Sequence, residues 1–190
     1  MSIPAQSLPH RHALTVNDYH RMGEAGILPP EARVELIEGE VIDMSPIGSH
    51  HAGIVTRLNR LLVQAVGTKA IVSIQNPVIL DGHSEPQPDI ALLQPRDDFY
   101  TLAHPKAREV LLLIEVAESS LRYDREIKIP LYARHGIPEV WLIDVEQRRL
   151  TQFLDPRESG YRSSVDVDVS NRLTPFALPG VDLDLSQLFA

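Results

Sequence analysis

The chain has 190 residues, of which 43% are hydrophobic, and its formal net charge is −8. This length and apolar content are sufficient for one domain with a buried core. The absence of cysteine excludes disulfides and thiolate metal sites, so any metal would be held by histidine and carboxylate groups. The negative charge argues against a broad basic surface for duplex DNA, although carboxylates that bind a metal also contribute to that charge.

The sequence predicts neither a secretion signal nor a membrane span. The chain does not open with a charged and then apolar leader, and its longest apolar run is far too short to cross a bilayer. We therefore expect a soluble, cytoplasmic protein that does not bind membranes.

The N-terminal region divides into an arm and the start of a domain. Residues 1–14 are rich in polar residues, proline and histidine without periodicity, which predicts a flexible arm. Thr15 or Asn17 can then cap a short helix. With no long linker after this point, residues 15–190 are predicted to form a single domain.

A hairpin and an amphipathic helix are predicted next. The stretch 34–44 is apolar but broken at Glu38-Gly39, which is typical of two strands joined by a tight turn. Ser49 can cap the helix that follows. Apolar residues recur there at helical spacing, namely Ile54, Leu58, Leu61, Leu62 and Ala65.

The central part of the chain predicts strands at residues 71–80, 89–93 and 110–117, with a loop or short helix at 96–108 between the last two. The run 110–117 is apolar throughout, as in a strand covered on both faces.

The C-terminal part predicts a helix at residues 122–134, which must begin late or bend because Pro130 cannot donate a backbone hydrogen bond. A buried strand at 140–145 continues into 150–154, and 161–169 alternates like an edge strand. The whole order describes an α/β (mixed α+β) fold with a central mixed sheet flanked by helices.

Glu115 is the strongest functional signal, because a carboxylate inside a buried strand needs a cation or strong donors. A buried ion pair with Arg122 or Arg125 is the structural alternative. Asp89 follows Pro88 at the start of the preceding strand. If the two carboxylates converge there, a hard divalent cation such as Mg²⁺ or Mn²⁺ neutralises both, which favours metal-dependent cleavage of phosphodiester bonds.

Four other side chains are candidates for the same site. Lys128 shares a predicted helix face with Asp124 and Tyr132, and its ammonium could stabilise a phosphate, although an exposed ion pair with Asp124 is the alternative. Glu35 could add a carboxylate or face outward on its strand. His51 could point from the amphipathic helix toward the sheet, or be an ordinary core or capping histidine.

Several of these residues lie in motifs that resemble a known family. Over residues 15–185 the chain resembles the Uma-two family of restriction-endonuclease-like proteins, which is assigned to the PD-(D/E)XK nuclease superfamily. The resemblance implies a core of one helix, three strands, a second helix and a further strand. The motifs that carry it are Val34-Glu-Leu-Ile-Glu-Gly-Glu-Val41, Met44-Ser-Pro46, His51, Pro88-Asp-Ile90, Ile114-Glu-Val116 with Ser119, Lys128 with Tyr132, and Gly136-Ile-Pro-Glu-Val-Trp-Leu-Ile-Asp144.

The resemblance also implies roles for the site residues. Asp89 and Glu115 would bind the metal, and Glu35 would be an auxiliary acid. The superfamily lysine two residues after the second acid would fall at Ala117, which cannot replace it. Related members place the lysine on the following helix, and Lys128 is the candidate for it here.

The function predicted from the sequence is therefore a Mg²⁺- or Mn²⁺-dependent endonuclease that acts on nucleic acid, DNA rather than RNA. By analogy with restriction-type enzymes we expect a homodimer. Two alternatives remain open. One is a catalytically silent binding or scaffold protein that keeps the fold. The other is a metal-dependent hydrolase of a small phosphorylated or nucleotide substrate, which suits the acidic chain.

The predicted clustering of carboxylates also has a consequence for stability. Asp89, Glu115 and Glu35 should repel one another when no cation is bound. We therefore expect Asp89→Asn to melt no lower than the wild type in chelator.

Overall fold

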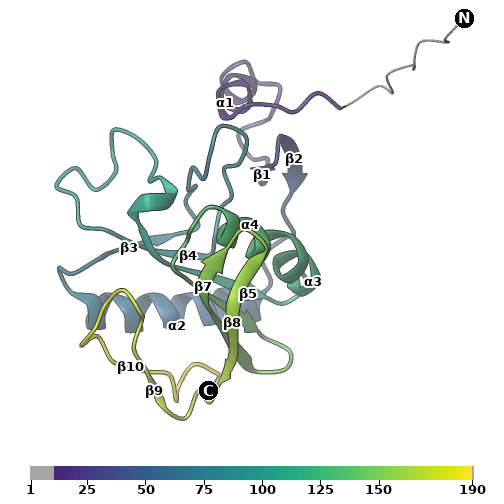
Figure 1. The fold of residues 1–190 in the computed structure, drawn as a ribbon. Helices are drawn as coiled ribbons and strands as arrows, with labels where there is room; N and C mark the ends of the chain where they lie inside the picture. The colour runs from purple at the N-terminus through teal and green to yellow at the C-terminus, as the bar shows by residue number, and fades with distance from the viewer. Residues whose placement is uncertain (1–10, 190) are drawn as a thin grey trace, which may run out of the picture.

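The computed structural model describes residues 11–189 and contains a mixed sheet of six strands in the order β3-β4-β5-β6-β7-β8 (Figure 1). Only β5 and β6 are parallel. The predicted central mixed sheet is confirmed. Its strands are β3 (Ile71–Ile74), β4 (Ile90–Leu93), β5 (Val110–Ala117), β6 (Glu139–Asp144), β7 (Arg149–Arg157) and β8 (Gly160–Val167).

The parallel pair requires a crossover, because two parallel neighbours cannot be joined by a tight turn. Here the crossover is a helical segment made of α3 (Leu121–Tyr123), a π-helical turn η2 (Asp124–Lys128) and α4 (Ile129–Arg134). The Ile129 N–H donates to the Asp124 carbonyl five residues back. Pro130 has no N–H to donate, so the bend predicted for this helix takes the form of a wide turn immediately before it.

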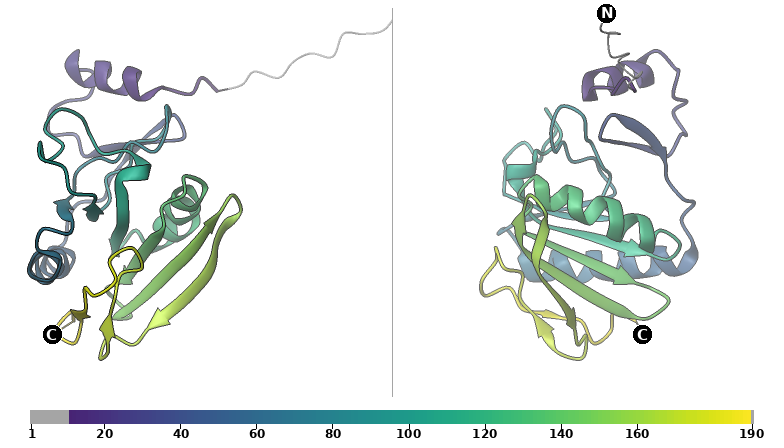
Figure 2. Two further views of the ribbon diagram at one scale, coloured as in Figure 1. Left: turned by 60° about the vertical axis from the view of Figure 1, so that its left-hand side comes forward. Right: turned by 45° about the vertical axis from the view of Figure 1, so that its right-hand side comes forward.

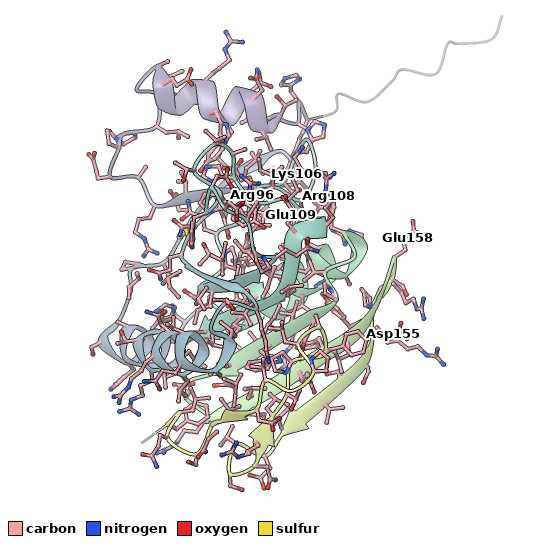
Figure 3. The ribbon with its side chains drawn as sticks, turned by 90° about the vertical axis from the view of Figure 1, so that its left-hand side faces the viewer. Arg96, Lys106, Arg108, Glu109, Asp155 and Glu158 are labelled. Atoms are coloured by element: carbon pink, nitrogen blue, oxygen red, sulfur yellow. The ribbon has the colours of Figure 1, made fainter. Side chains whose placement is uncertain are left out.

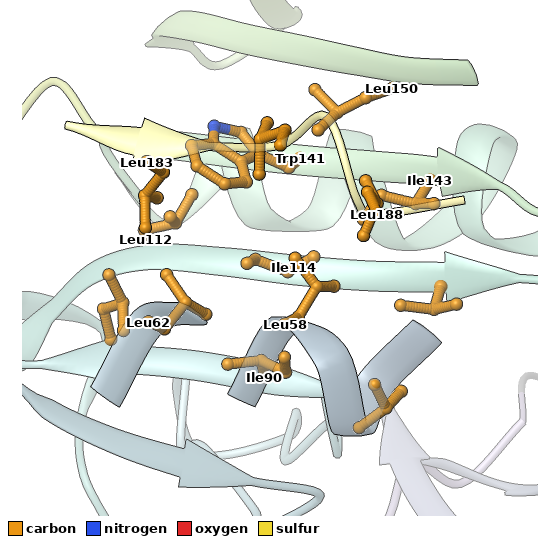
Figure 4. Close-up of a cluster of buried hydrophobic side chains, with 14 of the residues drawn as sticks. Leu58, Leu62, Ile90, Leu112, Ile114, Trp141, Ile143, Leu150, Leu183 and Leu188 are labelled. Carbon is orange, nitrogen blue, oxygen red and sulfur yellow. The ribbon is translucent and has the colours of Figure 1, made fainter. Parts of the chain in front are cut away.

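The two faces of the sheet are covered by different helices (Figure 2). Helix α2 (Ser49–Val66) and the C-terminal segment pack on one face, and α4 packs on the other. Successive residues of β5 alternate between these two cores, since Leu112 and Ile114 face α2 whereas Leu113 faces α4. Figure 4 shows the first core, where Leu58 and Leu62 of α2 lie against β5.

The N-terminal elements form a separate layer at one end of the sheet (Figure 1). Helix α1 (Val16–Glu24) is capped by Thr15 rather than Asn17, through a capping box with Asp18. The predicted hairpin is confirmed as β1 (Val34–Ile37) and β2 (Glu40–Asp43), with Glu38 and Gly39 at positive φ in the turn. The remaining short elements are η1 (Ala107–Glu109), β9 (Arg172–Leu173) and β10 (Leu183–Asp184).

The described part of the predicted arm contacts this hairpin. The Leu14 N–H donates to the Gly39 carbonyl at 3.0 Å. A β-carbon on Gly39 would lie 2.6 Å from the Cβ of Ala13, so the close approach requires glycine at that position. For residues 1–10, the predicted flexible arm lies outside the described residues.

Several predicted boundaries differ from the structure. The strand expected over 71–80 ends at Ile74, because Gln75 takes a positive φ of 50°. Gly48 is the N-cap of α2, and no side chain, including that of Ser49, makes a capping hydrogen bond there. The tail packs back onto the sheet through Leu188, which is fully buried. No helix within residues 11–189 is long and apolar enough to cross a membrane.

The core on the α2 face gives a stability prediction. Leu58 is fully buried, so we expect Leu58→Ala to destabilise the protein by about 2–5 kcal/mol through lost burial and the cavity left behind. Val63→Ala is the control on the same helix, because Val63 is 53% exposed and should change stability by less than about 0.5 kcal/mol. Urea unfolding of both variants measures this. Equal effects would contradict the assigned packing face.

Candidate active site

A cavity of about 280 Å³ lies where the end of β5, the start of α2 and the helical crossover meet. Its wall contains five of the six side chains that the sequence singled out, namely Glu35, His51, Asp89, Glu115 and Lys128. The sixth, Tyr132, is fully buried behind this wall and contacts Glu115. The structure therefore brings all six predicted residues together.

Glu115 reaches the cavity because of its place in β5. Side-chain alternation puts it on the same face as Leu113 and Ala117, toward the helical crossover rather than toward α2. Only 3% of its side chain is exposed. The arginine partners considered as an alternative are wrong, because the ion pair of Glu115 is with Lys128, whereas Arg122 pairs with Glu126 on the surface.

Lys128 lies between two carboxylates. Its Nζ is 2.9 Å from Oε1 of Glu115 and 3.2 Å from Oε2 of Glu35, and 4% of its side chain is exposed. The Tyr132 hydroxyl donates to the same Oε1 of Glu115 at 2.5 Å. The exposed ion pair proposed as an alternative for Lys128 is therefore wrong. The π-helical turn places Asp124 and Lys128, at its two ends, both in buried positions.

Glu35 faces inward from β1, so the alternative of an outward strand residue is wrong. Its side chain is 3% exposed. Besides Lys128, it accepts hydrogen bonds from the Gln87 backbone N–H at 3.0 Å and from the Tyr123 hydroxyl at 3.3 Å. These contacts connect the N-terminal hairpin to the site, and they position Glu35 to hold the ammonium of Lys128 from the side opposite Glu115.

Asp89 lies immediately before β4, and its carboxylate accepts a backbone hydrogen bond from the neighbouring strand β5. Its Oδ2 accepts the Val116 backbone N–H at 2.8 Å, and its Oδ1 accepts the Gln75 amide at 3.2 Å. Nε2 of His51, from the first turn of α2, lies 2.9 Å from Oδ1. His51 thus points toward the sheet. Its Nδ1 is buried and has no partner among the described residues.

The pKa values of the site carboxyl groups are shifted in different directions, upward for Glu115 and Asp124 and downward for Asp89. Burial raises the pKa of Glu115 to about 8, with Asp124 and Asp89 adding to the rise and Lys128 and Tyr132 opposing it. Burial also raises the pKa of Asp124. For Asp89 burial acts upward too, but His51 and the Val116 N–H outweigh it and lower its pKa. The hydrogen bond to Asp89 raises the pKa of His51.

Lys128 is held in its charged form. Burial acts to lower the pKa of its ammonium, but Glu115, Tyr132, Glu35 and Asp124 together raise that pKa well above the ordinary value for lysine. A permanent positive charge beside the cavity is what a phosphate group requires.

Three residues of the site were not singled out from the sequence. Tyr123 contacts Glu35, and Gln75 contacts Asp89 from the positive-φ turn after β3. Asp124 was noted for its spacing from Lys128, and it also lines the cavity and accepts a hydrogen bond from Ser120. Tyr123 could not be assigned to the site from its spacing. It lies five positions before Lys128, which does not place the two on one face of a regular α-helix, and the π-helical turn was not predicted.

The His, Asp and Glu side chains of the cavity can be compared with the ligands that Mg²⁺ and zinc take in proteins. Within residues 11–189, no three His, Asp or Glu side chains are grouped so that they could hold a metal ion by themselves. Mg²⁺ is commonly bound by one or two carboxylates together with water and substrate phosphates. Asp89 and Glu115 on one cavity wall fit that mode, whereas they do not provide a closed zinc cage.

Comparison with known proteins gives the family and the fold of the chain. The family model Uma2, described as "Putative restriction endonuclease", matches residues 16–186. A crystal structure from Anabaena variabilis ATCC 29413, described as a "putative nuclease belonging to DUF820", is similar with a TM-score of 0.71 at 19% sequence identity, covering 93% of this chain and 97% of that chain. At this identity the likeness shows a shared fold. No curated protein matches the chain.

The raised pKa of Glu115 predicts a pH-dependent stability difference. Its pKa of about 8 exceeds the ordinary value of 4.5, so the stability that its protonated form contributes is present below pH 4.5 and is lost as the pH rises toward 8. Glu115→Gln cannot ionise. We therefore expect the melting temperature of the variant, minus that of the wild type, to increase from pH 5 to pH 8. A constant or decreasing difference in thermal melts would contradict this assignment.

For Asp89 we predict the opposite pH dependence of stability. Its contacts also lead us to expect that removing its charge destabilises the protein, whereas the sequence led us to expect no destabilisation. Burial acts to raise the pKa of Asp89, but His51 and the Val116 N–H outweigh it and favour the carboxylate. We expect Asp89→Asn to lower stability by about 1–3 kcal/mol at pH 7, and the loss should shrink as the pH falls below the ordinary pKa of 3.8 toward the lowered pKa of Asp89. Asp97→Asn on the exposed loop is the control. Unfolding in chelator at pH 3 and pH 7 measures both.

Proposed function

Because the chain belongs to the Uma2 family of restriction-endonuclease-like proteins, we propose that it is a nuclease that hydrolyses phosphodiester bonds with Mg²⁺ or Mn²⁺ held by Asp89 and Glu115. The observation that carries this proposal is the position of Lys128, a buried ammonium fixed between Glu115 and Glu35 on the wall of the cavity that also contains Asp89. A bound metal would lower the pKa of water and offset charge on the phosphate.

The charges of the cavity wall support a divalent cation. The buried or nearly buried groups are four carboxylates, from Glu35, Asp89, Glu115 and Asp124, against two cations, Lys128 and protonated His51. Two negative charges remain uncompensated when all of these groups are ionised. Burial is the main cause of the raised pKa of Glu115, and the charges of Asp124 and Asp89 add to it; one divalent cation would offset those charges.

The protein side chains have separate roles in this proposal. Lys128 stabilises negative charge on the phosphate as the bond to the leaving oxygen breaks. Glu35 and Tyr132 are positioning residues, since Glu35 holds the ammonium and Tyr132 fixes Oε1 of Glu115. His51 keeps Asp89 ionised and oriented toward the cavity. A substrate bound there would meet an ammonium and two carboxylates already held in place, which reduces the reorganisation needed for reaction.

Nucleic acid is the substrate class that the family supports. Three finer points stay predictions: that the substrate is DNA rather than RNA, that the protein is a homodimer, and that it is cytoplasmic. One observation favours the alternative of a small phosphorylated or nucleotide substrate. The cavity of about 280 Å³ is small, and the chain is acidic, with a net charge of −8. Hydrolysis of mononucleotides but not of polymers would favour that alternative. Failure of the wild type on every substrate would favour the scaffold protein.

The test separates catalysis from metal binding. We expect the wild type to cleave plasmid, linear duplex or single strands only with Mg²⁺ or Mn²⁺, and Lys128→Met to lose at least about 100-fold in rate, because electrostatic groups of this kind contribute about 10²–10³. The variant keeps Asp89 and Glu115, so millimolar metal should still raise its melting temperature.

Lys69→Met is the matched control for this test, since Lys69 is exposed and lies outside the cavity. Equal cleavage by Lys128→Met and Lys69→Met would exclude Lys128 from catalysis. Cleavage by the wild type in chelator would contradict the metal dependence.

A further inference from the structure

A second cavity, of about 480 Å³, lies beside the first. It is lined by the N-terminal half of α2, the turn between β6 and β7, and the C-terminal segment. Glu118, after β5, lines both cavities. Besides Glu118, the charged, histidine and aromatic side chains of the second cavity are His50 and Arg57 of α2, Glu146 and Arg148 of the turn, and Phe189.

The two arginines carry charge that no described carboxylate neutralises. Within residues 11–189, no aspartate or glutamate forms a salt bridge with Arg57 or Arg148. Arg57 donates only long hydrogen bonds, of 3.3 and 3.4 Å, to the carbonyls of Gln187 and Leu188, and Arg148 donates to the Phe189 carbonyl. Glu118 and Glu146 line the same cavity, but within residues 11–189 neither forms a salt bridge with these guanidinium groups, which therefore can contact an anionic ligand.

Arg96 shows how this chain treats an arginine with a structural role. Its guanidinium pairs with Asp98 at 2.5 Å and with Glu109 at 3.4 Å. Figure 3 shows Arg96 and Glu109 close together. Arg57 and Arg148 differ from Arg96 in having no described carboxylate partner while lining a cavity.

The cavity also offers an aromatic surface. The guanidinium carbon of Arg148 lies 5.8 Å from the centre of the half-buried Phe189 ring. Arg148 adopts a positive φ of 52° in the turn before β7, which places a large cationic residue where glycine or asparagine is usual. An aromatic ring beside a guanidinium is suited to stacking a nucleobase while the cation contacts its phosphate.

Glu118 lies at the boundary between the two cavities, and its carboxylate is beside the N-terminus of α2, where a phosphate could also bind. Its Oε1 lies 3.1 Å from Nδ1 of His50, and its Oε2 lies so close to Gly48 that a β-carbon there would overlap it. Gly48 is the N-cap of the 18-residue helix α2, which has no capping side chain. The free N–H groups of a helix start bind carboxylate and phosphate alike.

We propose that the second cavity binds the nucleotide that flanks the scissile phosphodiester, with Arg57 and Arg148 on its phosphate and Phe189 against its base. The site rests on the proposed function for the adjacent cavity. Glu118 contacts His50 beside the α2 N-terminus until a phosphate replaces it. The ligand is an unpaired strand, because two arginines and a cavity within the ~300–1,000 Å³ range of nucleotide-sized pockets suit one nucleotide and not a duplex face.

The proposal is tested by binding without cleavage. Anisotropy of a labelled 12-nucleotide single strand is measured in EDTA at several salt concentrations. We expect Arg57→Gln and Arg148→Gln each to weaken binding at least about threefold and to reduce the slope of log affinity against log salt by about 0.7. Glu118→Gln removes a competing negative charge and should strengthen binding about threefold.

Arg60→Gln is the matched control, because Arg60 lies one turn further along α2, is exposed and does not line the cavity. A loss of affinity as large as that of Arg57→Gln would mean that any positive charge on the helix suffices, and would overturn the proposal. Equal affinity of a duplex, or equal competition by polyglutamate, would also overturn it. Arg148→Gln keeps the test decisive if Arg57→Gln unfolds, which melting temperatures show.

The outcomes separate this proposal from the nuclease proposal. A wild type that binds the strand in EDTA through both arginines, yet cleaves nothing with Mg²⁺ or Mn²⁺, supports the second cavity and contradicts the nuclease. A wild type that cleaves, with KM unchanged in Arg57→Gln and Arg148→Gln, supports the nuclease and overturns the second cavity.

Discussion

The ion pair between Lys128 and Glu115, shared with Glu35, is the interaction on which the arrangement of the site depends. Each of these groups is nearly excluded from water, so the ammonium of Lys128 depends on the two carboxylates beside it to offset the cost of its burial. The three belong to the N-terminal hairpin, the central strand and the helical crossover. Their mutual dependence fixes the position of the hairpin relative to the sheet, so a change at any one of them should disturb all three elements.

The topology of the sheet explains why these groups meet. The parallel pairing of β5 with β6 requires a helical crossover, and the crossover must pack on the face of β5 that carries Glu115. The π-helical turn before Pro130 widens the helix locally, and it carries buried Asp124 and Lys128 at its ends. On the neighbouring strand, β4 begins one residue after Asp89, and the carboxylate of Asp89 accepts the Val116 N–H that a longer β4 would have bonded.

Much of this arrangement could be predicted from the sequence, because it depends on strong local signals. The apolar run 110–117 around Glu115, the break at Glu38-Gly39 and the spacing of Leu58 and Leu62 each predicted an element that the structure confirms. The partner of Glu115 could not be predicted, since it depends on how the helix is wound before Pro130. The favourable environment of Asp89 could not be predicted either, because a backbone N–H and a histidine from α2 provide it.

The positions of the charged side chains matter more for binding a phosphate than the net charge of the chain. The carboxylates that line the first cavity are buried and partly protonated or paired, so they contribute less repulsion toward a phosphate than the net charge of −8 suggests. The arginines of the second cavity lie near them and form no salt bridge with an aspartate or glutamate within residues 11–189, although Glu118 and Glu146 line the same cavity. A nucleic-acid strand would therefore experience attraction over a short path along α2 rather than over a broad surface. Under the proposed function, this distribution would let an acidic protein act on nucleic acid without a broad surface for duplex DNA.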